Sequence, residues 1–500
     1  MTARARLDPH VRWVEDGAAV WIVAERPLRM WRVHPRVARL LDALRQNPDV
    51  EQALRTVPAL SRETAFDLLE RFSDEGLLQL EWLVPEDDLP AVTVVIPVRN
   101  RPRQIEACLA ALERLDYPRD RLEVIVVDDA STDETVQRVE PWVGRLPLRL
   151  VRMPIQVGAA ACRNQGAEQA RGELVAFTDS DCRPHPRWLC ELVPEFVRPS
   201  VVAVGGAVLP VDERNWLDRY EAVESPLTHG PAPARVQPRG AVPYLVTANM
   251  LVRRRALLDA GGFARIHPGE DVDLVWRFCA QGWRVLYRPH GVVYHDHRDR
   301  LWPFLRRRAA YATSEVVLVG RHPEYRHRLT LPMAVLASGA MVFAARRWRW
   351  FGPLALLPLF ADLASALRTV RGTGAPIGVR TVVAAEARGT AAALYWVGRT
   401  ISRYWSGPAL VAGALTGRWS AGRWLLALAV TSLVGTALVD GLRHRPRLDL
   451  LRFVVAHVLD DLANNVGLLA GCVRERTVRA LRIDVALYWP RQRRRQGHRA

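Results

Sequence analysis

The chain has 500 residues, 49% of them hydrophobic and 25% charged, so it is long enough for roughly two to four domains and is not globally disordered. All 70 basic residues are arginines, and with 53 acidic residues they give a net charge of +17. From Arg326 onward there are 26 arginines against 8 acidic residues, whereas residues 1–325 hold 44 against 45. This distribution argues against nonspecific nucleic-acid binding by the main body.

Cysteine spacing and the N-terminus indicate the compartment. None of the six cysteines forms a Cys-x-x-Cys pair, so neither a disulfide framework nor a structural zinc site is predicted, and a reducing compartment fits best. The first residues lack a basic flank followed by an apolar run and a cleavage site, so no secretion signal is predicted. We therefore expect the main body to face the cytoplasm.

Residues 1–84 are predicted to form a small α+β domain. Short β-type runs at 11–14, 19–23 and 30–33 precede helical spacing of apolar residues. Strands followed by three short helices are similar to winged-helix units such as the PqqD-like peptide-recognition domains, and a generic α/β cap is the alternative. Residues 85–90 contain Pro85, Asp87 and Asp88, a composition typical of a linker.

Residues 91–325 are predicted to form an α/β domain with a mostly parallel sheet, because buried-type strands alternate with helical stretches. The predicted strands are 92–97, 123–128, 148–151 and 173–177. Ligands of such open sheets bind at the carboxyl ends of the strands.

Residues 326–490 are predicted to be a helical, apolar region. Its uncharged runs, 329–345 and 424–439, are shorter than the ~20 residues of a spanning helix, which favours buried soluble helices. Tryptophans beside arginines at the run ends and the local positive charge favour membrane association through 329–440. The basic tail, 491–500, is interpreted as a solvated or lipid-headgroup contact.

Two Asp-x-Asp triplets are candidates for chemistry. Asp179 and Asp181 follow a predicted buried strand and would share one face if extended. Two hard carboxylates at a strand end suit Mg²⁺ or Mn²⁺ with a diphosphate. Asp271-Val-Asp273 matches the same pattern. The first triplet is favoured as the metal site because it follows a predicted strand.

Other polar residues are expected at the same edge of the sheet. Asp128 and Asp129 end the second strand, where they could accept hydrogen bonds from a uracil or ribose; the residues after them also read as a helix N-cap. The stretch 158–166 begins a helix with small residues and directs Arg163 and Asn164 towards this edge, although tight helix packing alone would explain it.

Downstream, Glu270 and Asp271 lie at a predicted helix start. Acidic residues there can cap the helix dipole or act as a general base. The dipole lowers a carboxylate pKa and weakens a base, whereas burial against Trp276 would offset this effect. His295 and His297 share a face if extended, and a neutral imidazole could complete a metal site; we favour His295.

Seven motifs in order resemble the family-2 glycosyltransferases over about residues 91–300. They are Val-Ile-Pro-Val-Arg-Asn (95–100), Val-Val-Asp-Asp-Ala-Ser (126–131), Ala-Cys-Arg-Asn-Gln-Gly (161–166), Asp-Ser-Asp (179–181), Gly-Gly-Phe (261–263), Gly-Glu-Asp (269–271) and His295. The resemblance implies a GT-A nucleotide-diphospho-sugar fold, a divalent cation and inversion at the sugar carbon. It also implies roles: donor binding by Pro97, Asn100, Asp128, Asp129, Arg163 and Asp179; metal binding by Asp179, Asp181 and His295; and catalysis by Asp271 with Glu270 beside it.

Further segments resemble the glycosyltransferases of mycofactocin systems, namely 244–249, 267–276, 294–298, 459–463 and 473–476. This resemblance implies a UDP-glucose donor, a peptide-derived redox cofactor precursor (premycofactocin) as acceptor, and β-1,4-glucosyl addition. Arg306–Tyr311 stands where processive synthases carry Gln-x-x-Arg-Trp, so short oligomers are expected. The expected location is the cytoplasmic face of the plasma membrane, with the cytoplasm as alternative.

Two other functions remain open. One is sugar transfer to a membrane polyprenyl phosphate or a cell-surface glycan, which the apolar C-terminal runs would permit. The other is a nucleic-acid-binding regulator built on the winged-helix-like N-terminus and the arginine-rich tail. A binding module has no need of carboxylates at strand and helix ends, so we expect no nucleic-acid partner.

Overall fold

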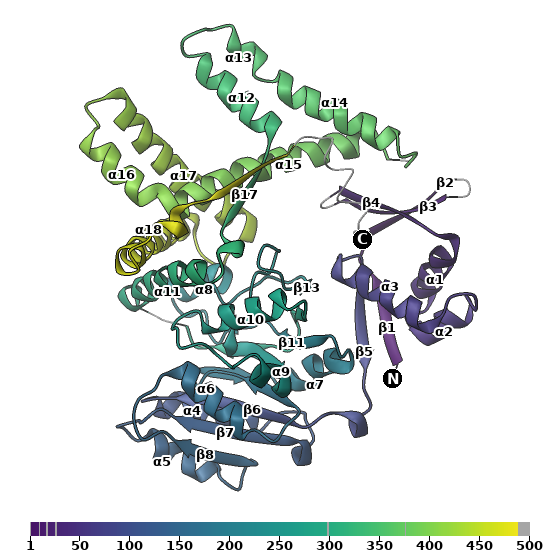
Figure 1. The fold of residues 1–500 in the computed structure, drawn as a ribbon, viewed down its shortest axis with the longest axis vertical. Coiled ribbons are helices and arrows are strands. Elements are labelled where there is room, and N and C mark those ends of the chain that lie inside the picture. The colour runs from purple at the N-terminus through teal and green to yellow at the C-terminus, as the bar shows by residue number, and fades with distance from the viewer. Residues whose placement is uncertain are drawn as a thin grey trace. The chain divides into compact units, whose positions relative to one another are not determined.

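The structure is a computed structural model that describes residues 2–9, 11–16, 19–25, 28–297, 300–375 and 377–488. It contains two compact units, each built from separate parts of the chain (Figure 1). The first comprises Met1–Arg4, Glu81–Tyr325 and Ala437–Ala480, and the second Ala5–Leu80, Arg326–Thr436 and Leu481–Ala500. The helical region predicted as continuous over 326–490 is therefore divided between them. The predicted basic tail, 491–500, lies outside the described residues.

An eight-stranded sheet forms the centre of the first unit, in the order β13-β15-β11-β14-β9-β6-β7-β8. The four predicted strands are confirmed as β6 (Val92–Val98), β7 (Leu122–Asp128), β8 (Leu148–Arg152) and β9 (Leu174–Phe177), all parallel. The other strands are β11 (Val201–Gly205), β13 (Ala234–Arg235), β14 (Met250–Arg253) and β15 (Arg284–Tyr287). Strand β14 runs antiparallel to β9 and β11, so the sheet is mixed.

Helices cover both faces of this sheet because its strands are buried on both sides. Val94 and Ile96 of β6 belong to a core that includes α4 (Pro102–Leu112). Val95, which faces the opposite way, belongs to a second core with α6 (Ala159–Gln169), α9 (Arg254–Asp259) and α10 (Glu270–Ala280). The predicted α/β class is confirmed.

A small sheet follows β9 directly. Its order is β10 (Cys182–Pro184), β16 (Val293–His295) and β12 (Val208–Pro210). The antiparallel register places Cys182 opposite His295. Two parts of the chain more than 100 residues apart thus meet beside the end of β9.

Helices α11 (Leu301–Arg321) and α18 (Leu450–Arg474) pack closely within the first unit. A Cβ on Gly467 would lie 2.0 Å from the Ala309 carbonyl oxygen, so only glycine allows this approach. The Thr313 hydroxyl also donates to the Gly467 carbonyl at 3.0 Å. Although α18 is apolar enough to cross a membrane, half of its apolar window is buried inside the protein.

The second unit begins with an antiparallel sheet of β2 (Val11–Asp16), β3 (Ala19–Glu25) and β4 (Leu28–Val33). Helices α1 (Pro35–Gln46), α2 (Val50–Arg55) and α3 (Arg62–Asp74) follow, and β1 (Thr2–Leu7) pairs with β5 (Leu78–Leu83). The predicted strands and helices are present, while the likeness to a winged helix stays a prediction. Within 85–90, Glu86–Asp88 forms a short 3-10 turn.

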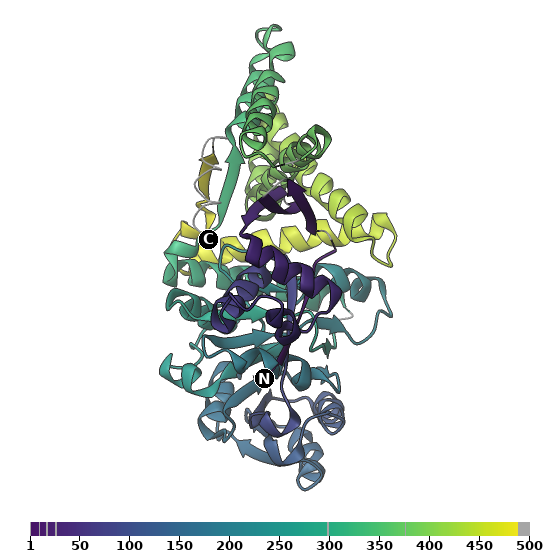
Figure 2. The same cartoon turned by 90° about the vertical axis from the view of Figure 1, so that its right-hand side faces the viewer.

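The remaining helices of this unit are mostly apolar. They are α12 (Met333–Ala344), α13 (Phe351–Leu354), α14 (Leu357–Arg371), α15 (Val379–Thr400), α16 (Ser406–Leu415) and α17 (Ser420–His444), which ends in the first unit. Helices α12 and α14 lie side by side (Figure 1, Figure 2). Strand β17 (Arg328–Pro332) pairs with β18 (Asp484–Tyr488).

Among the described residues, three helices are long and apolar enough to cross a membrane: Phe351–Arg371, α17 and α18. Phe351–Arg371 is the most exposed, with 11% of its apolar window buried. Helix α17 spans 25 residues, longer than the uncharged run from which it was predicted, because the helix continues through charged residues at both ends.

Candidate active site

The carboxyl ends of β6, β7 and β9 meet at one edge of the sheet because these strands are adjacent and parallel. Pro97 lies within β6, opposite Val127 of β7. After β6, Asn100 adopts a left-handed backbone conformation (φ 50°), its N–H donates to the Ser131 hydroxyl at 3.0 Å, and its side-chain oxygen accepts from the Thr132 N–H at 2.9 Å. Asn100 thus ties the loop after β6 to the loop after β7.

Asp128 and Asp129 have different surroundings at the end of β7. Asp129 accepts hydrogen bonds from the backbone N–H groups of Val157 (2.6 Å) and Gly158 (3.0 Å), so it holds the start of α6. Asp128 is buried, its Oδ2 accepts from the Ser131 N–H at 3.2 Å, and its Oδ1 has no hydrogen-bond partner among the described residues. Of the two, Asp128 retains an unused acceptor for a ligand.

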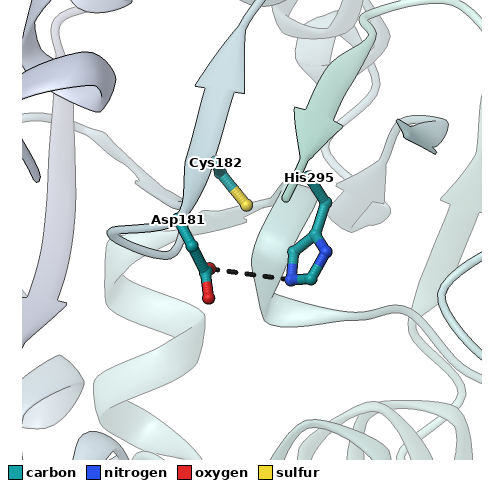
Figure 3. A group of neighbouring side chains, drawn as sticks. All are labelled: Asp181, Cys182 and His295. Carbon is teal, nitrogen blue, oxygen red and sulfur yellow. Dashed lines mark ion pairs between the residues drawn. The ribbon is translucent and has the colours of Figure 1, made fainter. Parts of the chain in front are cut away.

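Asp179 and Asp181 lie in the turn between β9 and β10 rather than in an extended segment. Asp179 accepts from Arg163 of α6 at 2.6 Å. Asp181 lies 3.2 Å from an Arg101 nitrogen at the start of α4 and 3.6 Å from His295 Nε2 (Figure 3). The turn places Asp179 beside Arg163 of α6 and Asp181 beside Arg101 at the start of α4, and the extended conformation from which a shared face was predicted is not present.

The group around Asp181 has the composition of a cation site. Ligand atoms of Asp181, Cys182 and His295 all lie within 4.8 Å of one another (Figure 3). The buried His295 Nδ1 makes no hydrogen bond to the described residues. Burial raises the pKa of the Cys182 thiol, as do Asp181 and Asp179, and the carboxylate and imidazole are the harder ligands of the three. Asp181 and His295 fit Mg²⁺ or Mn²⁺.

The two candidate histidines occupy different environments. His295 faces Asp181, whereas His297 Nδ1 lies 3.7 Å from Glu221 Oε2. Their rings are 4.9 Å apart. The geometry thus places His295, the favoured residue, beside the carboxylate, while the third predicted ligand, Asp179, is held by Arg163.

Helix α6 brings Arg163 to the centre of the site. A Cβ on Gly166 would lie 2.4 Å from Val95 Cγ1, so the glycine allows α6 to pack tightly on β6. The buried Arg163 guanidinium then donates to Asp179 Oδ1 at 2.6 Å and to Glu270 Oε1 at 2.8 Å. Arg163 joins the end of β9 to the start of α10.

The Gly-Gly-Phe motif supports this junction. Asn164 accepts from the Phe263 N–H at 2.8 Å and donates to the Phe263 carbonyl at 2.9 Å. Gly262 has φ 70°, and a Cβ there would lie 2.5 Å from Asn164 Oδ1. The Phe263 ring packs edge-on against Phe177, with ring centroids 5.0 Å apart, and so fixes the last residue of β9.

Glu270 and Asp271 begin α10 after Gly269, which has φ 109°. Burial alone would raise the pKa of Glu270, but the hydrogen bond with His267 and the charge of Arg163 outweigh it and lower the pKa to about 2. Burial raises the pKa of Asp271 to about 6, and the adjacent Glu270 charge adds to this rise. The two carboxyl groups therefore separate into a permanent anion and a group that gains or loses a proton near neutral pH.

Asp271 is held by two backbone groups, accepting from the N–H of Val272 (2.9 Å) and of Thr247 (3.4 Å). Asp273, two residues on, is buried and pairs with Arg277 at 2.9 Å, His322 at 3.0 Å and Arg321 at 3.2 Å. Burial alone would raise the pKa of Asp273, but His322 and Arg277 lower it. Asp273 is a structural ion pair and Asp271 a candidate base.

Sequence reasoning missed several neighbours of these groups: Arg101, Cys182, Thr247, His267 and Arg307. Arg307 lies with its guanidinium 4.8 Å from the Tyr311 ring centroid. Burial alone would lower the pKa of Arg307, but Tyr311 and the carboxylates of Asp179 and Glu270 raise it. Arg307 could have been found from the sequence, because Arg306–Tyr311 occupies the place of the Gln-x-x-Arg-Trp pattern.

The chain is similar to known glycosyltransferases. The family model "Glycosyl transferase family 2" matches residues 93–260. The chain is 32% identical over 501 residues to the pre-mycofactocin glycosyltransferase of Mycobacterium tuberculosis, with 96% of this chain and 97% of that protein covered. It is 31% identical over 209 residues to glycosyltransferase AglE of Haloferax volcanii, with 41% and 66% covered.

One similar solved structure is the mannosyltransferase PcManGT from Pyrobaculum calidifontis in complex with GDP-Man and Mn²⁺. It is 23% identical, with a TM-score of 0.39 and coverage of 70% of this chain and 90% of that one. The match to the M. tuberculosis protein extends over nearly the whole chain, whereas the family model ends before Glu270, Asp271 and His295.

Proposed function

This chain belongs to glycosyl transferase family 2, and from that premise we propose that it transfers glucose from UDP-glucose to a premycofactocin-like acceptor. The product is a short β-1,4-linked oligoglucoside on a peptide-derived redox cofactor precursor. The acceptor is suggested by the full-length similarity to the pre-mycofactocin glycosyltransferase.

The observation that carries the proposal is the position of Arg163. Its guanidinium contacts both Asp179 after β9 and Glu270 at the start of α10, at 2.6 and 2.8 Å. The side chain is 4% exposed, so this bridge is part of the folded core. It holds Asp179, a proposed donor-binding carboxylate, next to the helix start that also carries Asp271, the proposed base.

In the proposed reaction, an acceptor hydroxyl attacks the anomeric carbon from the face opposite the diphosphate. The new carbon–oxygen bond forms as the bond to UDP breaks, and Asp271 takes the hydroxyl proton. One displacement inverts the carbon, so an α-linked donor gives a β-glycoside. A pKa of about 6 suits Asp271 to this role, because a general base works best when its pKa lies near the operating pH.

The donor is held by residues at the sheet edge. The unused Oδ1 of Asp128 is placed to accept from the uracil or ribose, with Pro97, Asn100 and Asp129 shaping the same loops. Asp181 and His295 hold the divalent cation, which when bound neutralises charge on the leaving diphosphate. Arg307 adds a fixed positive charge near Asp179.

Mass spectrometry of acceptor reactions tests this function. The full-length protein is incubated with UDP-glucose and the peptide-derived acceptor, and hexose-sized increments on the acceptor are expected. Asp271→Asn is the control and should form them at least about a hundredfold more slowly. Absence of increments with wild-type protein that still binds UDP would contradict the acceptor assignment, whereas failure to bind UDP would contradict the donor site.

We also propose that the protein associates with the cytoplasmic face of the plasma membrane. Phe351–Arg371 and α17 are apolar enough to span, and several tryptophans around these helices are exposed: Trp348, Trp350, Trp396, Trp419 and Trp424. Tryptophan is enriched at membrane interfaces. All six cysteines are free, which fits a reducing compartment.

These exposed helices favour a second candidate acceptor, a membrane polyprenyl phosphate or a cell-surface glycan precursor. The same labelled donor is offered to polyprenyl phosphate in vesicles and to the soluble peptide-derived acceptor. We expect label on the soluble acceptor. Label on the lipid alone would replace the first proposal with the second.

A further inference from the structure

A second group of polar side chains lies inside the first unit, apart from Asp181 and Asp271. It is formed by α8 (Trp216–Glu224), the end of α17, and α18. Ligand atoms of Glu224, Asp440 and His457 all lie within 4.8 Å of one another. Asp440 and His457 are buried, at 3% and 0% exposure, so solvent does not supply their hydrogen bonds.

His457 is the central residue of this group. Its Nε2 lies 3.1 Å from Asp440 Oδ2. Its Nδ1 makes no hydrogen bond to the described residues and lies 3.8 Å from Asp461 Oδ2 on the same helix. A fully buried imidazole between two carboxylates is the arrangement in which metal-binding histidines occur, with one nitrogen on the ion and the other directed at a carboxylate.

Carboxylates gather around this histidine. Five carboxylates belong to the surrounding network, those of Glu221, Glu224, Asp440, Asp460 and Asp461. Arg308 contacts Glu221 at 3.6 Å and Asp460 at 3.3 Å. Burying several carboxylates together is costly unless protons or cations compensate them.

We propose that Glu224, Asp440 and His457 form a binding site for a first-row divalent metal ion of the Zn²⁺ type. Two carboxylate oxygens and one imidazole nitrogen match the ligands that Zn²⁺ accepts. Ligands about 2.1 Å from a tetrahedral ion stand about 3.4 Å apart, so side-chain movements of about an ångström close the site. His444, whose Nδ1 lies 3.0 Å from Glu224 Oε1, is placed to orient this carboxylate.

The ion has a structural role. It fastens the hairpin of α17 and α18 to α8, joining residues more than 200 positions apart. Helix α8 also carries Glu221, the partner of His297 at 3.7 Å, and His297 is two residues from His295. The site therefore supports the segment that carries a proposed ligand of the catalytic cation without itself contacting the donor.

Zn²⁺ binding by the full-length protein in detergent tests this proposal, with Zn²⁺ alone as the probe and a chromophoric chelator as competitor. The Asp181→Asn background removes the other candidate site. We expect this variant to bind one Zn²⁺ and the Asp181→Asn/Glu224→Gln variant to bind none. Asp461→Asn in the same background should weaken binding by about 10–100-fold, because it removes the carboxylate that orients the imidazole.

Melting temperatures provide a second readout that does not depend on activity. At a hundredfold excess over Kd, Zn²⁺ should raise the melting temperature of the Asp181→Asn protein by about 5 °C and leave that of the Glu224→Gln double variant unchanged. The matched control is Glu213→Gln, which removes a nearby surface carboxylate 3.9 Å from Arg447 and should behave as the background. One Zn²⁺ still bound after Glu224→Gln, or none bound before it, overturns the proposal.

Discussion

The end of β9 and the start of α10 carry the same pattern, Asp-x-Asp, in different environments. At 179–181 the two carboxylates separate in a turn, towards Arg163 and towards His295. At 271–273 they separate around a helix, so that Asp271 faces Thr247 and Asp273 pairs with Arg277 and His322. In each triplet the backbone conformation determines which groups each carboxylate contacts.

The difference lies in what compensates each charge. Asp273 pairs with two arginines and with His322 and has a lowered pKa, whereas Asp271 has two backbone N–H groups, an adjacent Glu270 anion and a raised pKa. Asp181 has one arginine at 3.2 Å and a neighbouring imidazole. Asp273, which is paired with Arg277 and Arg321, stabilises the fold, while the raised pKa of Asp271 makes that carboxylate available for a proton.

Asp271→Asn should have the largest effect. The amide keeps the size of the side chain but cannot accept the hydroxyl proton, so we expect kcat to fall about 10²–10⁴-fold with UDP affinity and metal affinity retained. Steady-state transfer assays and calorimetric UDP titration measure the two properties. Turnover near the wild-type level would remove Asp271 from the chemistry and with it the contrast to Asp273.

Asp181→Asn should have the next largest effect. Loss of a cation ligand removes several kcal/mol of charge stabilisation at the leaving diphosphate, which corresponds to a fall in kcat of about 10²–10³-fold. The metal concentration for half-maximal activity should also rise. A variant with the wild-type metal dependence would show that the cation, if required, binds elsewhere.

Glu270→Gln should change the pH dependence more than the rate. Asp271 must be ionised to accept a proton, so wild-type activity should fall as pH decreases through about 6. Removing the Glu270 anion removes a cause of the raised pKa and frees Arg163 to lower it further. We expect the acidic limb to move down by about one pH unit, with less than a tenfold loss of kcat at pH 8.

The control for the expected shift of the acidic limb is the pH–rate profile of His267→Gln. His267 contacts Glu270 at 3.3 Å from an exposed position, and its removal leaves the Glu270 anion in place. The acidic limb of this variant should stay within a few tenths of a unit of the wild type. If Glu270→Gln also leaves the limb unchanged, the Glu270 charge does not set the proton affinity of Asp271.

The sequence predicted the local features of the fold and the site, but not the contacts between distant residues. The strands around Asp128 and Asp179 and the helix start at Glu270 were predicted because apolar periodicity and breakers are local signals. The Arg163–Glu270 pair was not predicted, because it joins residues 107 positions apart and depends on how α6 and α10 pack. The extended conformation expected for Asp179–Asp181 was wrong, because a turn replaces it.

The C-terminal region shows the same limit. Composition predicted apolar helices over 326–490, but the division between the two units depends on contacts that no local pattern encodes. Gly467 and Gly471, which allow α18 to approach α11, are ordinary residues in an apolar sequence. The buried Asp460 and Asp461 were available as a signal, because paired carboxylates inside an apolar helix indicate a protein environment around that helix.

Asp273→Asn should have the smallest effect on catalysis and a clear effect on stability. The side chain is 1% exposed and bonds to Arg277, Arg321 and His322, so the amide leaves three donors with weaker acceptors. Arg277 and Arg321 are partly exposed, and solvent limits the loss to about 1–3 kcal/mol of the free energy of unfolding. Urea denaturation monitored by circular dichroism measures it, with kcat expected within threefold of the wild type.

This last variant separates two explanations of the difference between the triplets. If partners decide the role, Asp273→Asn destabilises the fold and leaves the proton affinity of Asp271 unchanged, because the two carboxylates have different hydrogen-bond partners. If the Asp-x-Asp pattern itself acts as a unit, the variant loses turnover by a factor approaching that of Asp271→Asn at unchanged stability. The first outcome would mean that the second triplet contains one functional carboxylate and one structural carboxylate, and that their Asp-x-Asp spacing has no functional meaning of its own.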